Sequence, residues 1–123
     1  MHANLVAGWI GLLAGIFAGA VIGLFIHRDS WLGGYDAWPR RMVRLGHISF
    51  IGLGILNLLF AFTCSLEQLT GPAVSVASWM LIGGAAAMPT CCFLAAWKKG
   101  LRHLFPIPVV LVAGTIVLLM ISW

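Results

Sequence analysis

Charged side chains are scarce in this sequence. Only 8% of the 123 residues are charged, as seven Lys/Arg and three Asp/Glu, whereas 62% are hydrophobic. A soluble domain carries roughly 25% charged residues, so a water-facing surface cannot be built from this set. The mean hydropathy of +1.06 agrees. The composition excludes soluble globular, disordered and disulfide-scaffold folds, and it indicates that most of the chain contacts lipid.

Reactive groups are scarce as well. The sequence contains no C-x-x-C, H-E-x-x-H, phosphate-binding loop or nucleophile elbow. No Asp, Glu or Lys lies inside a long apolar run, which argues against a proton-coupled transporter with a central carboxylate. The cysteines are odd in number, and we expect Cys64, Cys91 and Cys92 to be buried small hydrophobes. These absences favour a protein that is not an enzyme.

Four apolar runs are long enough to cross a bilayer as helices, which takes about 20 residues each. The expected spans are residues 5–26, 42–65, 72–97 and 104–123. The first lacks a basic segment before it and continues past Ala18-Gly19-Ala20, so we expect a retained helix and not a cleaved signal peptide. The predicted fold is all-α and integral to the membrane. Four antiparallel transmembrane helices form a bundle, as a single domain over residues 1–123.

All seven basic residues lie in or beside two predicted loops, residues 27–41 and 98–103, which share one side of the membrane. They are Arg28, Arg40, Arg41, Arg44, Lys98, Lys99 and Arg102. The positive-inside rule places these loops in the cytoplasm and both termini outside, in a membrane of the bacterial inner-membrane type. Membrane topology thus explains the excess of basic over acidic residues. We therefore expect the lipid bilayer, and no nucleic acid, as a partner.

Small residues predict close helix packing. The first span repeats glycine every four residues, at Gly11, Gly15, Gly19 and Gly23. Residues at this spacing share one helix face, so they form a groove that another helix can approach closely. The groove fits either the second span of the same chain or a neighbouring protein.

The second span carries a mostly small or polar face. At about 100° per residue, His47, Gly54 and Asn57 fall within about 80° of arc, together with Phe50 and Ala61. An amide in hydrocarbon must find a hydrogen-bond partner, because leaving it unpaired costs several kcal/mol. Asn57 is therefore predicted to join helices, with contact to a ligand as the alternative.

Three histidines are expected at similar depth near the cytoplasmic edge: His27, His47 and His103. Imidazole is a usual axial ligand of membrane b-type haem, and it also contacts quinones and metals. A cofactor site near His47, with His27 or His103 as a second ligand and Asn57 nearby, is therefore one hypothesis. Packing and interfacial roles are the other.

The sequence leaves three functions open. The leading prediction is a non-catalytic integral membrane subunit of a larger, bioenergetic electron-transfer complex, respiratory or photosynthetic, with a b-type haem or quinone near His47. Other membrane subunits would then be its partners. The alternative is a small homo-oligomeric channel or transporter that assembles through the glycine groove. A membrane enzyme acting on lipid has only the His47 and Asn57 face in its support.

Overall fold

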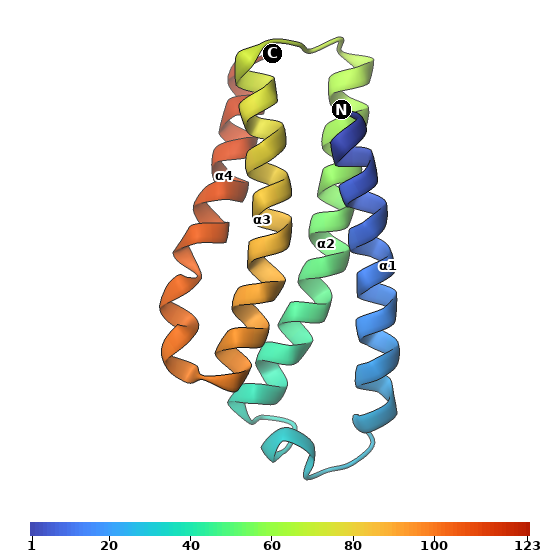
Figure 1. Ribbon diagram of the computed structural model, residues 1–123, viewed down its shortest axis with the longest axis vertical. Helices are drawn as coiled ribbons and strands as arrows, with labels where there is room; N and C mark the ends of the chain where they lie inside the picture. Colours follow the sequence, from blue (N-terminus) through green and yellow to red (C-terminus); the bar gives the residue numbers. More distant parts are fainter.

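The computed structural model describes all residues from Met1 to Trp123, and every regular element in it is helical. The long helices are α1 (His2–Phe25), α2 (Trp38–Leu66), α3 (Pro72–Trp97) and α4 (Pro106–Ile121). Short 3₁₀ helices, η1 (Trp31–Gly33) and η2 (Lys99–Leu104), lie in the connections that precede α2 and α4. The chain therefore has four principal helices and no strand (Figure 1).

Proline marks the start of three of these helices. Pro39, Pro72 and Pro106 each occupy one of the first two positions of a helix, where the missing N–H has no intrahelical acceptor to lose. This places the start of α2 at Trp38, earlier than the expected span at 42. α4 has only 16 residues. Together with η2 it forms a helical stretch of 23 residues, which is long enough to cross a bilayer.

All four helical segments are long and apolar enough to span a membrane, with lengths of 24, 29, 26 and 23 residues. The helices run alternately up and down, so both termini lie at one end of the molecule (Figure 1). The connections at the opposite end are residues 26–37, with η1, and 98–105, with η2. We call these two ends the terminal end and the basic end, because the second carries all seven Lys and Arg residues.

The helices form an open row. α1 packs mainly on α2, α2 on α3, and α3 on α4, so the order of contacts follows the order in the sequence (Figure 1). α1 and α4 consequently lie at the two edges of the row. Both edge helices expose large apolar side chains, among them Leu13 and Phe17 of α1 and Val110 and Met120 of α4. Apolar faces of this size are unfavourable in water.

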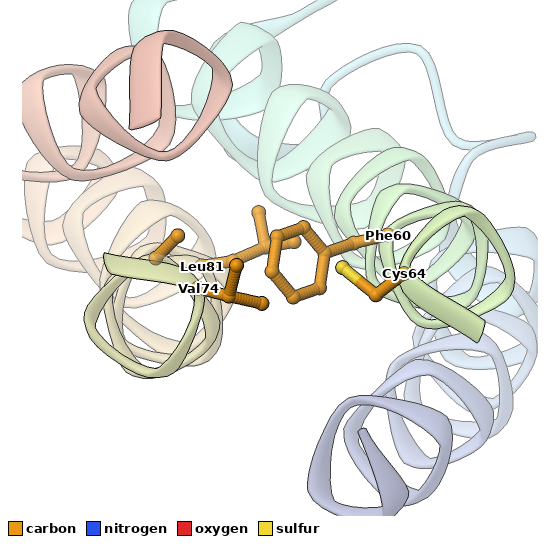
Figure 2. Close-up of a cluster of buried hydrophobic side chains, with 5 residues drawn as sticks. Phe60, Cys64, Val74 and Leu81 are labelled. Carbon is orange, nitrogen blue, oxygen red and sulfur yellow. The ribbon is translucent and has the colours of Figure 1, made fainter. Parts of the chain in front are cut away.

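A buried apolar cluster joins α2 and α3 near the terminal end. Phe60 and Cys64 of α2 meet Val74, Ala77 and Leu81 of α3, and each is at most 4% exposed. The Phe60 ring points from α2 toward Leu81 and Val74 (Figure 2). Because the cluster includes Cys64, that thiol is a buried packing group here.

Candidate functional site

Glycines let α1 and α2 approach closely. A β-carbon on Gly54 of α2 would lie 3.0 Å from the carbonyl oxygen of Gly8, and one on Gly11 would lie 3.1 Å from the Cα of Gly54. Further along, a β-carbon on Gly15 would meet Ile51 at 2.5 Å. Gly23 differs, because nothing lies within 4 Å of its β-carbon position. The groove of the glycine repeat is thus filled by α2 of the same chain, and Gly23 lies beyond this contact.

A polar network joins three helices near the terminal end. The Asn4 side-chain N–H₂ of α1 donates to Asn57 Oδ1 of α2 at 2.9 Å and to the Ser78 carbonyl of α3 at 3.3 Å. The Ser78 hydroxyl donates back to Asn4 Oδ1. Asn57 also donates to the Leu53 carbonyl at 2.9 Å. Both asparagines are fully buried, so these bonds fix the relative positions of α1, α2 and α3.

Two further polar contacts join neighbouring helices. The buried Thr115 hydroxyl of α4 lies 3.1 Å from the Ala77 carbonyl of α3. At the basic end, the Trp38 indole N–H of α2 donates to the Ala95 carbonyl of α3 at 2.8 Å. Each pair of neighbours in the row therefore has at least one polar side-chain contact, and the single Thr115 hydrogen is shared between the Ala77 carbonyl and the Leu111 carbonyl of α4 at 2.9 Å.

His47 lies against Gly19 of α1. Its Cε1 is 2.7 Å and its Nε2 3.2 Å from the position that a Gly19 β-carbon would occupy, and its Nδ1 is buried without a hydrogen-bond partner. The ring therefore packs against the backbone of α1 at Gly19. The geometry supports a packing role for His47. Its contact with a haem or a quinone stays a prediction.

The other two histidines of the proposed cofactor site lie elsewhere at the basic end. His27 is exposed just after α1, eight residues beyond Gly19, which corresponds to about 12 Å of helix rise. His103 is exposed in η2, and η2 packs on α3. No group of three or more His, Cys, Asp or Glu side chains comes close enough to hold a metal ion. The side chain of Asn57, the fourth residue of the predicted cofactor site, is hydrogen-bonded to the Asn4 side chain and to the Leu53 carbonyl.

Arg40 is the one buried charged residue, with 4% of its surface exposed. Its guanidinium donates to the Ile26 carbonyl at 2.6 Å and approaches the carbonyls of Arg28 and Asp29 at 3.4 and 3.5 Å. It also lies 5.7 Å from the centre of the Trp31 ring. A cation is favourable beside the free carbonyls at a helix C-terminus, so Arg40 holds the end of α1 to the start of α2.

Four of the six other cations of the basic end lie over aromatic rings. Arg28 is 5.8 Å from the Phe25 ring centre, and Arg44 is 4.1 Å from that of Tyr35. Arg41 and Lys99 share the Trp38 ring, at 5.9 and 5.2 Å. Such contacts hold the cations over an apolar support at the level where a bilayer meets water. We call this set, with Arg40 and Trp31, the aromatic–cation collar.

Two apolar hollows lie in the half of the molecule next to the collar. The first, of about 570 Å³, lies between α2 and α4 and is lined by Leu45, Gly52 and Val109 among others; we call it the α2–α4 groove. The second, of about 400 Å³, is lined by residues of α1, α2 and α3 together with Trp31. The terminal end has a more polar hollow of about 440 Å³ against the α2–α3 connection.

Sequence reasoning missed several of these residues. Asn4 fell just before the expected start of the first span, although it is the only amide in the first 56 residues. That scarcity was the signal that could have paired it with Asn57. Arg40 was assigned to a loop, and its burial follows from the earlier start of α2. The shared use of Trp38 by Arg41 and Lys99 depends on tertiary structure alone.

Comparisons with known proteins found no match. No protein-family model matches the chain, and no curated protein sequence or solved structure is significantly similar to it. The length and apolarity of the four helices define the class, which is an α-helical integral membrane protein.

Proposed function

We propose that the protein is a non-catalytic integral membrane subunit that assembles with other membrane proteins through the edges of its helix row. The observation that carries this proposal is the open arrangement itself. α1 and α4 each pack mainly against one neighbour and leave large apolar faces free. In lipid, helices associate by close packing and polar contacts, so an open edge can accept a further helix without rearranging the row.

The contacts within the chain support the proposal of a structural, non-catalytic subunit. The glycine face of α1 is used within the chain, and so is the amide of Asn57. A homo-oligomeric channel built on the glycine groove, which is the rival proposal, would have to assemble through some other surface. The electron-transfer role in the leading prediction rests on His47, whose ring packs against α1. We therefore propose the subunit without a cofactor.

We further propose that the basic end faces the cytoplasm and that both termini are outside, in a bacterial-type inner membrane. All seven basic residues belong to the basic end, and the terminal end carries no Lys or Arg. Cytoplasmic loops of membrane proteins are enriched in these residues. Reporter fusions after Trp123 and within 98–103 test the orientation, because a cytoplasmic signal at Trp123 would contradict it.

Photo-crosslinking in intact membranes tests the assembly. A benzophenone side chain at Ile10 of α1 or Val110 of α4 samples the two edges, since these residues are 61% and 65% exposed, and Leu59 of α2, at 54%, is the control. We expect a single adduct with a distinct, larger membrane protein at one edge and a weaker adduct at Leu59. A ladder in steps of 13.2 kDa would support the homo-oligomeric channel instead. Absence of protein adducts at both edges would also contradict the proposal.

A further inference from the structure

The side chain of Trp38 is held in place at the basic end. It is the first residue of α2, and its indole N–H is held by the Ala95 carbonyl of α3 at 2.8 Å. Arg41 from α2 and Lys99 from η2 both lie within 6 Å of the centre of this ring. Two like charges held beside one ring repel each other, and the repulsion is relieved when an anion lies between them.

The α2–α4 groove opens on the same face of α2. At about 100° per residue, Trp38, Arg41 and the α2 residues that line the groove fall within about 140° of arc, and all of them except Leu53 fall within about 100°. Those lining residues are Leu45, Ile48, Ser49, Gly52, Leu53 and Leu56. Phe105 and Val109 form the opposite wall, and they follow directly after η2, which carries Lys99. The helix register thus places Arg41 one turn from Leu45, on the side of the groove that faces the basic end.

The groove is apolar and has room for a chain. Ten of its twelve lining residues are hydrophobic, and its volume is about 570 Å³. Gly52 leaves part of the wall empty, since nothing lies within 4 Å of its β-carbon position. A ligand that fits both the cation pair and the α2–α4 groove must carry a negative group at one end and a hydrocarbon chain attached to it. In a membrane, an anionic phospholipid has this form.

We propose that the chain binds one anionic phospholipid of the leaflet at its basic end. The phosphate lies between Arg41 and Lys99 beside Trp38, and one acyl chain lies in the α2–α4 groove. A guanidinium and an ammonium are both suited to phosphate oxygens. The site is formed by a single chain, so it goes beyond the proposed assembly and does not depend on partner subunits.

Native mass spectrometry of the full chain in mild detergent tests the site. The probes are phosphatidylglycerol and phosphatidylcholine with the same acyl chains, and the measurement is the apparent Kd of the first bound lipid. We expect phosphatidylglycerol to bind about tenfold or more tightly than phosphatidylcholine, because each basic residue near a phosphate favours binding of anionic lipid. Equal Kd values for the two lipids would overturn the proposal.

Charge variants locate the headgroup. Arg41→Gln with Lys99→Gln should remove the preference for phosphatidylglycerol. The matched control, Arg28→Gln with Arg44→Gln, removes the same charge from residues on other rings and should retain the preference. If both double variants lose it equally, the basic end attracts anions only diffusely and the proposed site is wrong. If the first double variant does not elute as a folded monomer, Lys99→Gln alone replaces it, because Lys99 is exposed in η2.

Groove variants locate the acyl chain. Gly52→Leu places a side chain in the empty part of the groove, and Gly23→Leu is the matched control on α1, since both β-carbon positions are free of neighbours within 4 Å. We expect Gly52→Leu to weaken phosphatidylglycerol binding several-fold and Gly23→Leu to leave it unchanged. Glycerol 3-phosphate distinguishes a free phosphate site from a lipid site. Displacement of the lipid by equimolar glycerol 3-phosphate, or unchanged binding in Gly52→Leu, would contradict a chain-binding groove.

Discussion

The terminal and basic halves of the helix row are held together in different ways. In the terminal half, Asn4, Asn57 and Ser78 join three helices, and the cluster around Phe60 fills the space between α2 and α3. In the basic half, two apolar hollows of about 570 and 400 Å³ lie between the helices, whereas the hollow of about 440 Å³ at the terminal end is more polar and lies against the α2–α3 connection. We infer that the polar network and the cluster make the terminal half the more rigid part, whereas the apolar hollows of the basic half can accept other molecules.

The largest loss of stability is expected from a substitution in the α1–α2 contact of the terminal half. Gly54→Leu would place a side chain against the backbone of Gly8 and Leu12, at 3.0 and 3.1 Å, where neither atom can give way. We expect a loss of about 3 kcal/mol or more of folding free energy, seen as loss of folded monomer in size-exclusion chromatography. Gly23→Leu makes the same change outside the contact. Equal yields of the two variants would show that the helices do not meet at Gly54.

The polar network should contribute less, but in a cooperative way. Asn57→Leu removes the acceptor of the Asn4 amide and should destabilise the protein by about 1–2 kcal/mol in denaturant titrations in detergent. Asn4→Leu should have a similar effect, and the double variant should cost less than the two single variants together. Strictly additive losses would mean that the two asparagines do not bond to each other.

At the basic end we expect a local effect. Arg40→Gln replaces the guanidinium that holds the Ile26 carbonyl with a shorter, uncharged amide, and the end of α1 should then open more often. Hydrogen exchange should rise in residues 26–34, while global stability falls by less than about 1 kcal/mol, because water at the interface can replace the lost bonds. Arg102→Gln, an exposed residue of η2, is the control. A loss of global stability as large as that of Asn57→Leu would contradict the account, because the basic half would then stabilise the fold as much as the terminal half does.

Hydropathy was sufficient to predict four helices long enough to span a membrane, because apolar runs of this length have few other structures in lipid. Periodicity identified the glycine face of α1 and the polar face of α2, but it could not say that these two faces meet each other. That outcome depends on Gly8 and Gly54 lying opposite one another, which is a tertiary fact. The pairing of Asn4 with Asn57 and the sharing of Trp38 by two cations are of the same kind.

The histidine hypothesis shows the limit most clearly. Topology brings His27, His47 and His103 toward one end of the molecule, but depth in the membrane does not decide which way a ring points. His47 lies on the α1 side of α2 against Gly19, whereas His103 is carried by η2 beside α3. Residues can therefore share a level in the membrane and still lie on different sides of the helix row.

The most direct test of a fixed terminal half and an open basic half is a pair of distance distributions from pulsed electron paramagnetic resonance in nanodiscs. Spin labels at Phe62 and Val117 report on α2 and α4 in the terminal half, and labels at Ile48 and Ile107 report on the same helices in the basic half. All four residues are at least 56% exposed, and Cys64, Cys91 and Cys92 are replaced by Ala. We expect a narrow distribution for the first pair and a broader one for the second. Equal widths, or a broader distribution in the terminal half, would contradict the account.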